Sequence, residues 1–206
     1  MIEEAKLDEV GSGLAPVSPG WFVVNVGEAA WVRNDAFGGR CVFESTPRVL
    51  AERPGVEPQF FTETGFTLAV LEPGKPTGMY HAESSQEDFL VLAGTCLLLV
   101  EEQERRLHAW DFVHCPAGTR HGFVGIGEQP CVIFMSGARR EGDTIVYPRS
   151  EAALARNAGV ETETNAPAEA YAPFSHWRLG PPRRLGRSAL GLTGIGQRTL
   201  SRAASS

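Results

Sequence analysis

The sequence has 206 residues, which is enough for one well-buried core with appendages. Its composition, 42% hydrophobic and 21% charged, is that of a globular protein, and no apolar run approaches the roughly 20 residues of a membrane-spanning helix. The whole chain carries −6 while residues 176–206 carry +6, so the remaining residues carry −12, and this acidic body argues against nucleic-acid binding.

The start of the chain and its cysteines bear on the cellular compartment. The opening Met-Ile-Glu-Glu-Ala-Lys is acidic and does not resemble a secretory signal. The cysteines are scattered and form no Cys-x-x-Cys motif; they are Cys41, Cys96, Cys115 and Cys131. Unclustered cysteines suit a reducing environment better than a disulfide framework, so we expect a cytoplasmic protein.

The first third of the chain predicts little regular structure. Residues 1–20 are rich in Gly, Pro and Ser and are expected to form a flexible lead-in. Trp21–Val26 and Cys41–Glu44 have the length and composition of strands. Proline interrupts residues 46–59, which predicts a loop with at most one helical turn.

From residue 66 onward, short apolar runs alternate closely with Gly, Pro or charged turns. The predicted strands are Phe66–Leu71, Asp88–Leu92, Cys96–Glu101, Arg105–Ala109, Asp111–Cys115, Gly122–Val124 and Cys131–Met135. Many short strands at this spacing are typical of an all-β sandwich or barrel. We therefore predict a β-barrel domain over residues 21–148.

The predicted strand at 88–92 is apolar on both faces, apart from Asp88. A strand of this kind is covered on two sides, by a barrel interior and by a second sheet or subunit. Since exposed apolar faces need a cover, we expect a homodimer in which the N-terminal strand or the Tyr171–Phe174 arm lies over the sheet.

The pattern changes after Pro148. Ser150 is a plausible N-cap and Gly159 a plausible stop, which predicts a short helix at Glu151–Ala158. Residues 149–175 are then a helix and an irregular arm. Residues 176–206 form a basic tail, expected to be disordered, with contact to an anionic partner as the alternative.

Three side chains carry the chemistry. His81 and Glu87 flank a short polar turn, and His121 follows the Pro116-Ala-Gly118 turn. A strand–turn–strand would let His81 and Glu87 both point inward, with His121 entering from a neighbouring strand. Two imidazoles and one carboxylate hold a divalent metal and leave positions open. The alternative is three unrelated polar residues on strands.

These residues resemble the two motifs of the cupin superfamily. Gly74, His81, Glu87 and Gly94 fit the first motif, and Glu87 and Gly94 have its spacing of six intervening residues. Pro116, Gly118 and His121 fit the second motif. The resemblance covers roughly residues 60–140. It implies a double-stranded β-helix, the cupin jelly-roll barrel, with a short C-terminal helix and flexible termini, and a bound divalent transition metal such as Zn, Fe, Mn or Ni.

The sequence departs from the family pattern in three places. Met79 stands where the first motif has its leading His, five residues rather than three or four separate His81 from Glu87, and Trp110 replaces the opening Gly of the second motif. The resemblance then implies metal ligands His81, Glu87 and His121. The longer turn leaves Glu83 or Gln86 as alternatives to Glu87.

Residues near the three ligands are candidates for the wall of the pocket. They are Met79, Phe89, His114 and Phe123, and for His114 an ordinary strand residue is the alternative. Met79 is expected as an apolar wall residue rather than a thioether ligand, because soft sulfur is unusual beside hard oxygen. Cys115 is expected as a buried small hydrophobe rather than a nucleophile.

Two functions fit this pattern. The first is a metal-dependent cupin enzyme, such as a dioxygenase, isomerase or lyase, that acts on a small organic molecule in the barrel mouth. The second is a non-catalytic module with a degenerate metal site that binds or senses a small ligand. The replacement of the leading His by Met79 motivates the second.

Overall fold

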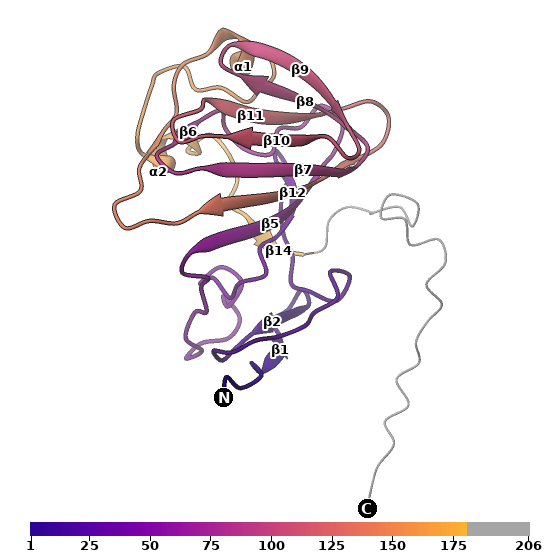
Figure 1. Ribbon diagram of the computed structural model, residues 1–206, viewed down its shortest axis with the longest axis vertical. Helices are drawn as coiled ribbons and strands as arrows, with labels where there is room; N and C mark the ends of the chain where they lie inside the picture. Colours follow the sequence, from indigo (N-terminus) through magenta and orange to yellow (C-terminus); the bar gives the residue numbers. More distant parts are fainter. Residues whose placement is uncertain (181–206) are drawn as a thin grey trace, which may run out of the picture.

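Two antiparallel sheets pack face to face in the computed structural model of the protein, which describes residues 1–180 (Figure 1). The larger sheet runs in the order β10 (Phe112–Cys115), β7 (Glu87–Ala93), β12 (Cys131–Ala138), β5 (Thr64–Leu71), β4 (Gly38–Cys41), β3 (Val32–Asn34) and β14 (Arg178–Leu179). The smaller sheet runs β11 (His121–Ile126), β8 (Thr95–Val100) and β9 (Gln103–His108). The fold is therefore all-β, a cupin-type jelly-roll barrel.

Four further strands and two short helices complete the described elements. β13 (Ile145–Val146) pairs with β6 (Ala82–Glu83), and β1 (Leu7–Glu9) pairs with β2 (Leu14–Pro16). The helices are α1 (Glu151–Leu154) and α2 (Pro167–Ala170). Within residues 1–180, no helix has both the length and the apolar character that a bilayer crossing requires.

The main core lies between the two sheets, where alternate residues of each strand point inward. Phe89 and Val91 of β7 meet Leu98 of β8 and Phe123 of β11 in one buried cluster. Glu87 belongs to the same inward-facing series as Phe89 and Val91. The period of two that buries this core therefore also turns the carboxylate of Glu87 toward the barrel interior.

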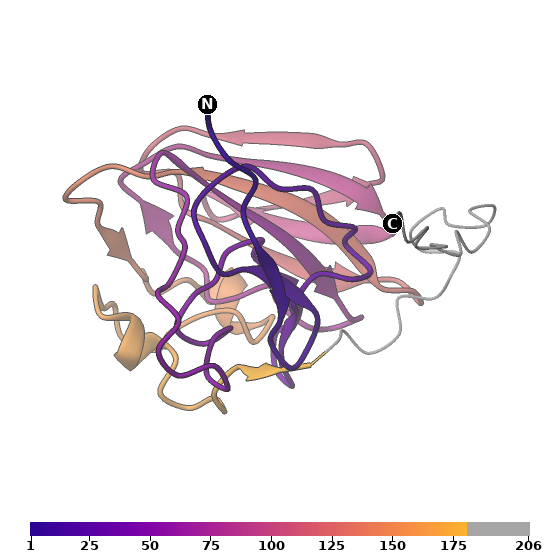
Figure 2. The same cartoon turned by 90° about the horizontal axis from the view of Figure 1, so that it is seen from below.

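The outer face of the larger sheet is partly covered by the chain's own N-terminal segment. Trp31 is buried there, and Val24, Val26 and Leu92 pack against the same cluster. Figure 2 shows this segment crossing in front of the sheets. The expectation that β7 is covered on both faces is met at Leu92 by residues of the same chain.

Several predicted elements in the first third are corrected. Residues 1–20 contain the β1–β2 hairpin rather than only a loose lead-in. Trp21–Val26 is not a strand, because within it only Trp21 makes a bridge, to Glu4. The strand expected at Cys41–Glu44 lies earlier, at β4, since Phe43 has a φ of +56° that no strand tolerates.

The C-terminal helix was predicted correctly in position but is shorter than predicted. The Ser150 side chain accepts a hydrogen bond from the backbone N–H of Ala153, which confirms the predicted N-cap. Helix α1 is shorter than predicted, because Asn157 already adopts a left-handed backbone with a φ of +56°. Most of the basic tail lies outside the described residues, but its start is regular: β14 pairs with β3.

The predicted C-terminal arm packs on the body of the protein. Tyr171, Phe174 and Trp177 surround the buried ring of Phe37 at centroid distances of 5.4, 4.7 and 6.2 Å. Aromatic side chains bury a large area each, so this cluster anchors the arm. Tyr171 of this arm also lines the cavity that contains His81, Glu87 and His121.

Candidate metal centre

His81 and His121 lie opposite each other in an antiparallel backbone bridge. The N–H of His81 donates to the carbonyl of His121 at 3.0 Å, and the N–H of His121 donates to the carbonyl of His81 at 2.8 Å. Residues paired in this way present their side chains on the same face. Two imidazoles that are far apart in the sequence thus come together with ring centroids 4.8 Å apart.

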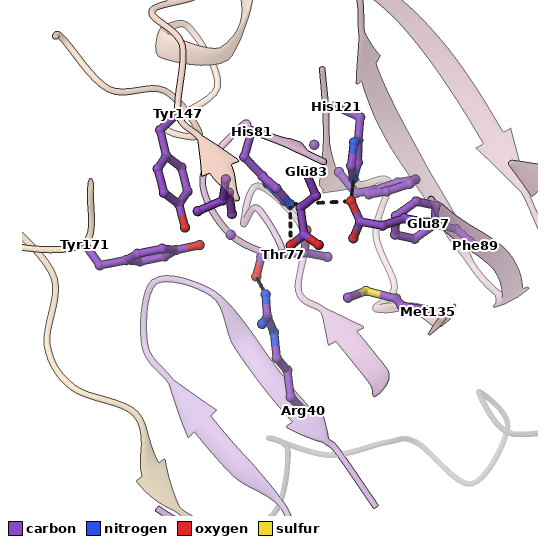
Figure 3. Close-up of a pocket in the computed structure, with 14 residues that line it drawn as sticks. Arg40, Thr77, His81, Glu83, Glu87, Phe89, His121, Met135, Tyr147 and Tyr171 are labelled. Atoms are coloured by element: carbon purple, nitrogen blue, oxygen red, sulfur yellow. Dashed lines mark hydrogen bonds and ion pairs between the residues drawn. The ribbon is translucent and has the colours of Figure 1, made fainter. Parts of the chain in front are cut away.

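Glu87 completes the group from the first position of β7. Glu87 pairs across the sheet with Gly137 of β12. A Cβ at position 137 would lie 3.7 Å from the Glu87 Cγ, in van der Waals contact with it. Glu87 Oε2 lies 3.4 Å from His121 Nε2 and 3.9 Å from His81 Nε2 (Figure 3). One ligand atom from each of the three residues falls within 4.8 Å of the other two.

The imidazoles are oriented by backbone carbonyls. His81 Nδ1 lies 2.7 Å from the carbonyl oxygen of Met79, and His121 Nδ1 lies 3.1 Å from that of Thr119. A carbonyl only accepts, so each Nδ1 carries the proton and donates it, which leaves the Nε2 lone pairs free toward Glu87. A hydrogen bond that fixes the far nitrogen is the usual support of a metal-ligating histidine.

Burial sets the charge state of all three groups. It lowers the pKa of His81 to about 3, with the neighbouring His121 as the next cause, and it lowers the pKa of His121. Burial also raises the pKa of Glu87 to about 8, with the charge of Glu83 adding to the effect. Both histidines are therefore neutral near pH 7, as metal ligation requires.

The donor set thus fits a divalent transition metal. Two neutral imidazole nitrogens and one carboxylate oxygen converge on one point, and a cation there would favour the ionised form of Glu87. Beyond these three side chains the cavity supplies Glu83, whose Oε1 lies 3.9 Å from His81 Nε2.

The two alternatives to Glu87 differ in position. Glu83 lines the cavity, but it does not belong to the group of mutually close ligand atoms. Gln86 is exposed and donates to Asp88 Oδ2 at 2.6 Å, so it points away from the imidazoles. The geometry favours Glu87 over both.

The predicted wall residues divide into two pairs. Phe89 and Phe123 line the cavity. Met79 is buried instead in the cluster around Phe37 and contributes only its carbonyl to His81. His114 alternates onto the outer face of β10, where its half-exposed ring hydrogen-bonds to Asp88 Oδ1 at 2.7 Å. Met79 and His114 are therefore placed outside the cavity wall.

Cys115 does not have the setting of a nucleophile. It is buried in the main core, and burial raises the pKa of its thiol to about 12. The expectation of a small buried hydrophobe is confirmed.

Sequence reasoning missed much of the cavity wall. The cavity has a volume of about 220 Å³. Its further lining includes Arg40, Thr77, Glu83, Met135, Ile145, Tyr147 and Tyr171 (Figure 3). Arg40 comes from β4, Tyr147 follows β13 and Tyr171 follows α2. All three lie outside the two motifs, and no local pattern marks them.

The middle of the chain matches a known family. Residues 67–137 match the Cupin domain family. These residues form a cupin domain. The matched segment contains both motifs and the three candidate ligands, so the resemblance inferred from the sequence is confirmed.

Solved cupin-like structures resemble parts of this chain. A protein from Acidithiobacillus ferrooxidans is 26% identical over 54% of this chain and 66% of its own, with a TM-score of 0.42. KdgF from Halomonas sp. is 22% identical over 60% and 97%, with a TM-score of 0.44. The DMSP lyase DddQ from Ruegeria pomeroyi is 23% identical over 46% and 48%, with a TM-score of 0.39.

These overall similarities are too low to transfer an activity. The matched segment spans less than two thirds of the first and third of those proteins. No curated protein matches the sequence.

Proposed function

We propose that this cupin is a metal-dependent enzyme that acts on a small organic molecule in its barrel cavity, with a divalent transition metal held by His81, Glu87 and His121. One observation carries the proposal: two neutral imidazoles and a partly buried carboxylate converge at a cavity that also holds other ionisable side chains. A carboxylate facing a barrel interior is costly unless it is paired, protonated or bound to a metal.

The bound metal would supply Lewis-acid polarisation of the ligand. The chain's own groups would handle protons. Burial raises the pKa of Glu83, so this carboxyl can hold or take up a proton beside His81. Burial also raises the pKa of Tyr147, which keeps its phenol protonated and able to donate. Groups that exchange protons next to a Lewis acid favour isomerase or lyase chemistry over oxygen chemistry.

The second candidate is a ligand-binding or sensing module with a degenerate metal site. The position of Met79 supports it, because this replacement for the leading His of the motif is turned into a neighbouring cluster and leaves three protein ligands. Three ligands are also the usual number in a catalytic zinc site, so this observation alone favours the second candidate only weakly.

Elemental analysis of the purified protein, before and after loading with Zn, Mn, Ni or ferrous ion, tests the metal. We expect about one metal per chain in the wild type. We expect at least a hundredfold weaker binding in His121→Ala and in Glu87→Gln, since even residues behind the ligands cost about 10- to 100-fold in affinity. His108→Ala, an exposed histidine of β9, is the matched control and keeps the metal.

Absence of stoichiometric metal from the wild type under all these conditions would refute the proposal. Metal binding without turnover of small organic acids, sugars or sugar acids would instead favour the second candidate. Turnover that disappears in His81→Ala would exclude that candidate.

Two further expectations stay predictions. The first is a homodimer, for which sedimentation at micromolar concentration is the test. Trp110 and Phe112 at edge strand β10 are 75% and 65% exposed, which is the apolar surface that a second copy would cover. The second is a cytoplasmic location, which fractionation of cells would test.

A further inference from the structure

Arg40 enters the cavity from the side opposite the metal-binding imidazoles. It lies on β4, beside Ala69 of β5, and its guanidinium reaches the carbonyl of Thr77 (Figure 3). The guanidinium also sits 4.9 Å from the ring centroid of Trp177. A planar cation fixed by a carbonyl on one side and an aromatic ring on the other is held in place for recognition.

The protein does not neutralise this cation. Among residues 1–180, no carboxylate lies within ion-pair distance of Arg40. Its Nε is buried and has no hydrogen-bond acceptor in this part of the chain. A largely buried guanidinium without a carboxylate partner is costly, and a ligand anion would offset that cost.

Two tyrosines stand beside the arginine. The rings of Tyr147 and Tyr171 meet edge to face at 5.9 Å, and both side chains line the cavity. The Tyr171 hydroxyl accepts the backbone N–H of Met79 at 3.1 Å, so its own proton is available to a further acceptor. Phenolic donors next to a guanidinium suit the oxygens of a carboxylate.

The space between the two ends of the cavity is partly apolar. Phe89, Met135 and Ile145 line it, and the total volume is about 220 Å³, the bulk volume of about seven water molecules. This room suits a short carbon chain rather than a sugar polymer. The carboxylates of Glu83 and Glu87 near the imidazoles disfavour a second negative charge on the ligand.

We propose that the ligand of this cavity is a small monocarboxylate, whose carboxylate is bound by Arg40 with the tyrosine hydroxyls while its other end reaches toward His81, Glu87 and His121. The location of the reacting end rests on the proposed function. The contact with Arg40 does not, because it needs no metal.

Butyrate and its neutral analogue butyramide are the probes, titrated into the full-length protein in EDTA and again after metal loading, with binding followed by calorimetry and NMR. In EDTA we expect wild type to bind butyrate at least tenfold more tightly than butyramide. Arg40→Gln should lose at least tenfold in butyrate affinity. Arg105→Gln is the control, because Arg105 lies on exposed β9 and its side chain hydrogen-bonds to Gln103 and to the carbonyl of Glu104, far in sequence from the cavity residues.

The proposal would be overturned by equal binding of butyramide, by no saturable butyrate binding at millimolar concentration, or by butyrate binding that Arg40→Gln leaves unchanged. In the last case, loss of binding on chelation would place the carboxylate on the metal. Inorganic phosphate that binds more tightly than butyrate would also overturn it, in favour of a dianion. Metal content is measured separately, so a result against carboxylate binding by Arg40 can be told apart from a result against metal binding.

Arg40→Gln is checked by thermal unfolding before titration. If the variant does not fold, the wild-type comparison of butyrate with butyramide decides, together with Arg40→Lys. We expect Arg40→Lys to keep the preference for the charged probe and to bind it more weakly, because an ammonium lacks the planar fork of the guanidinium.

Discussion

Arg139 holds the buried carboxylate of Glu44 through two parallel hydrogen bonds, at 2.6 Å to Oε1 and 2.8 Å to Oε2. The Glu44 side chain is only 3% exposed, whereas that of Arg139 is 39% exposed. The backbone N–H of Phe61 also donates to Glu44, at 2.7 Å. The pair ties the N-terminal part of the chain to the residue that follows β12.

Arg139→Met should lower the free energy of unfolding by about 2 kcal/mol, because it leaves a buried carboxylate without its cation. The cost stays below that of a fully buried pair, since water reaches the guanidinium. Arg149→Met breaks the exposed pair with Glu151 and should cost less than about 0.5 kcal/mol. Urea denaturation measures both, and equal effects of the two substitutions would contradict this prediction.

Gly94 allows the tight turn from β7 into β8. Its φ is +75°, and a Cβ there would lie 2.5 Å from the carbonyl oxygen of Pro130 and 2.8 Å from the Cα of Cys131. Gly127 also has a positive φ, +87°, but open space around it. We expect Gly127→Ala to cost about 1 kcal/mol for the backbone alone, and Gly94→Ala to cost roughly 1 to 3 kcal/mol more. If the two variants had the same unfolding midpoint, the backbone around Gly94 would have to move away from the added Cβ without cost, and this prediction would be wrong.

The cysteines should resist thiol reagents while the protein is folded. All four are buried, and burial raises the pKa of Cys41 to about 11 and that of Cys115 to about 12. At pH 8 their reaction with iodoacetamide should be at least about 100-fold slower than that of an exposed cysteine introduced as Ser84→Cys. Unfolding in guanidinium should release four reactive thiols. Rapid labelling of one native cysteine in the wild type would rule out this packing.

The metal-free protein should have a stability plateau between about pH 4.5 and 6.5. The pKa of His81 is lowered from 6.5 to about 3, so the unfolded chain binds the extra proton and stability falls as the pH drops below 6.5. The pKa of Glu87 is raised from 4.5 to about 8, so the folded chain keeps its proton and stability falls as the pH rises from 4.5 to about 8. Between 4.5 and 6.5 the two slopes oppose each other.

Thermal unfolding in EDTA from about pH 3 to about pH 8 measures the plateau and the declines on both sides of it. Glu87→Gln carries no titrating carboxyl and should lose the decline at high pH while keeping the decline at low pH. Stability that climbs steadily from pH 6.5 to 8 in the wild type would contradict the raised pKa of Glu87.

The barrel strands were predictable because each carries enough local information. From Phe66 to Met135 the apolar runs are bounded by turn residues, and the strands observed there differ from the predicted ones by a few residues at their ends. The strands β1, β2 and β3 have three residues each; β1 and β2 pair with each other in a hairpin, and β3 pairs with β4 and with the distant β14. A run of three residues is too short to show the alternation on which a strand prediction depends.

The candidate site likewise has a part that the sequence predicted and a part that it did not. The two motifs place His81, Glu87 and His121 on strand ends that the barrel brings together, so their spacing was informative. Arg40, Tyr147 and Tyr171 reach the same cavity from segments that only tertiary packing places there. His114 was a candidate for the wall, with an ordinary strand residue as the alternative, and the alternation along β10 turns it outward.

The matched cupin segment does not contain all of the residues that line the cavity. Arg40 lies upstream of residues 67–137, and Tyr147 and Tyr171 lie downstream. Anyone who trims the gene to the family boundaries would keep the three candidate ligands and discard a flank of the chamber. Mutational libraries aimed at altered ligand preference should accordingly include these outlying residues, one of which lies on strand β4.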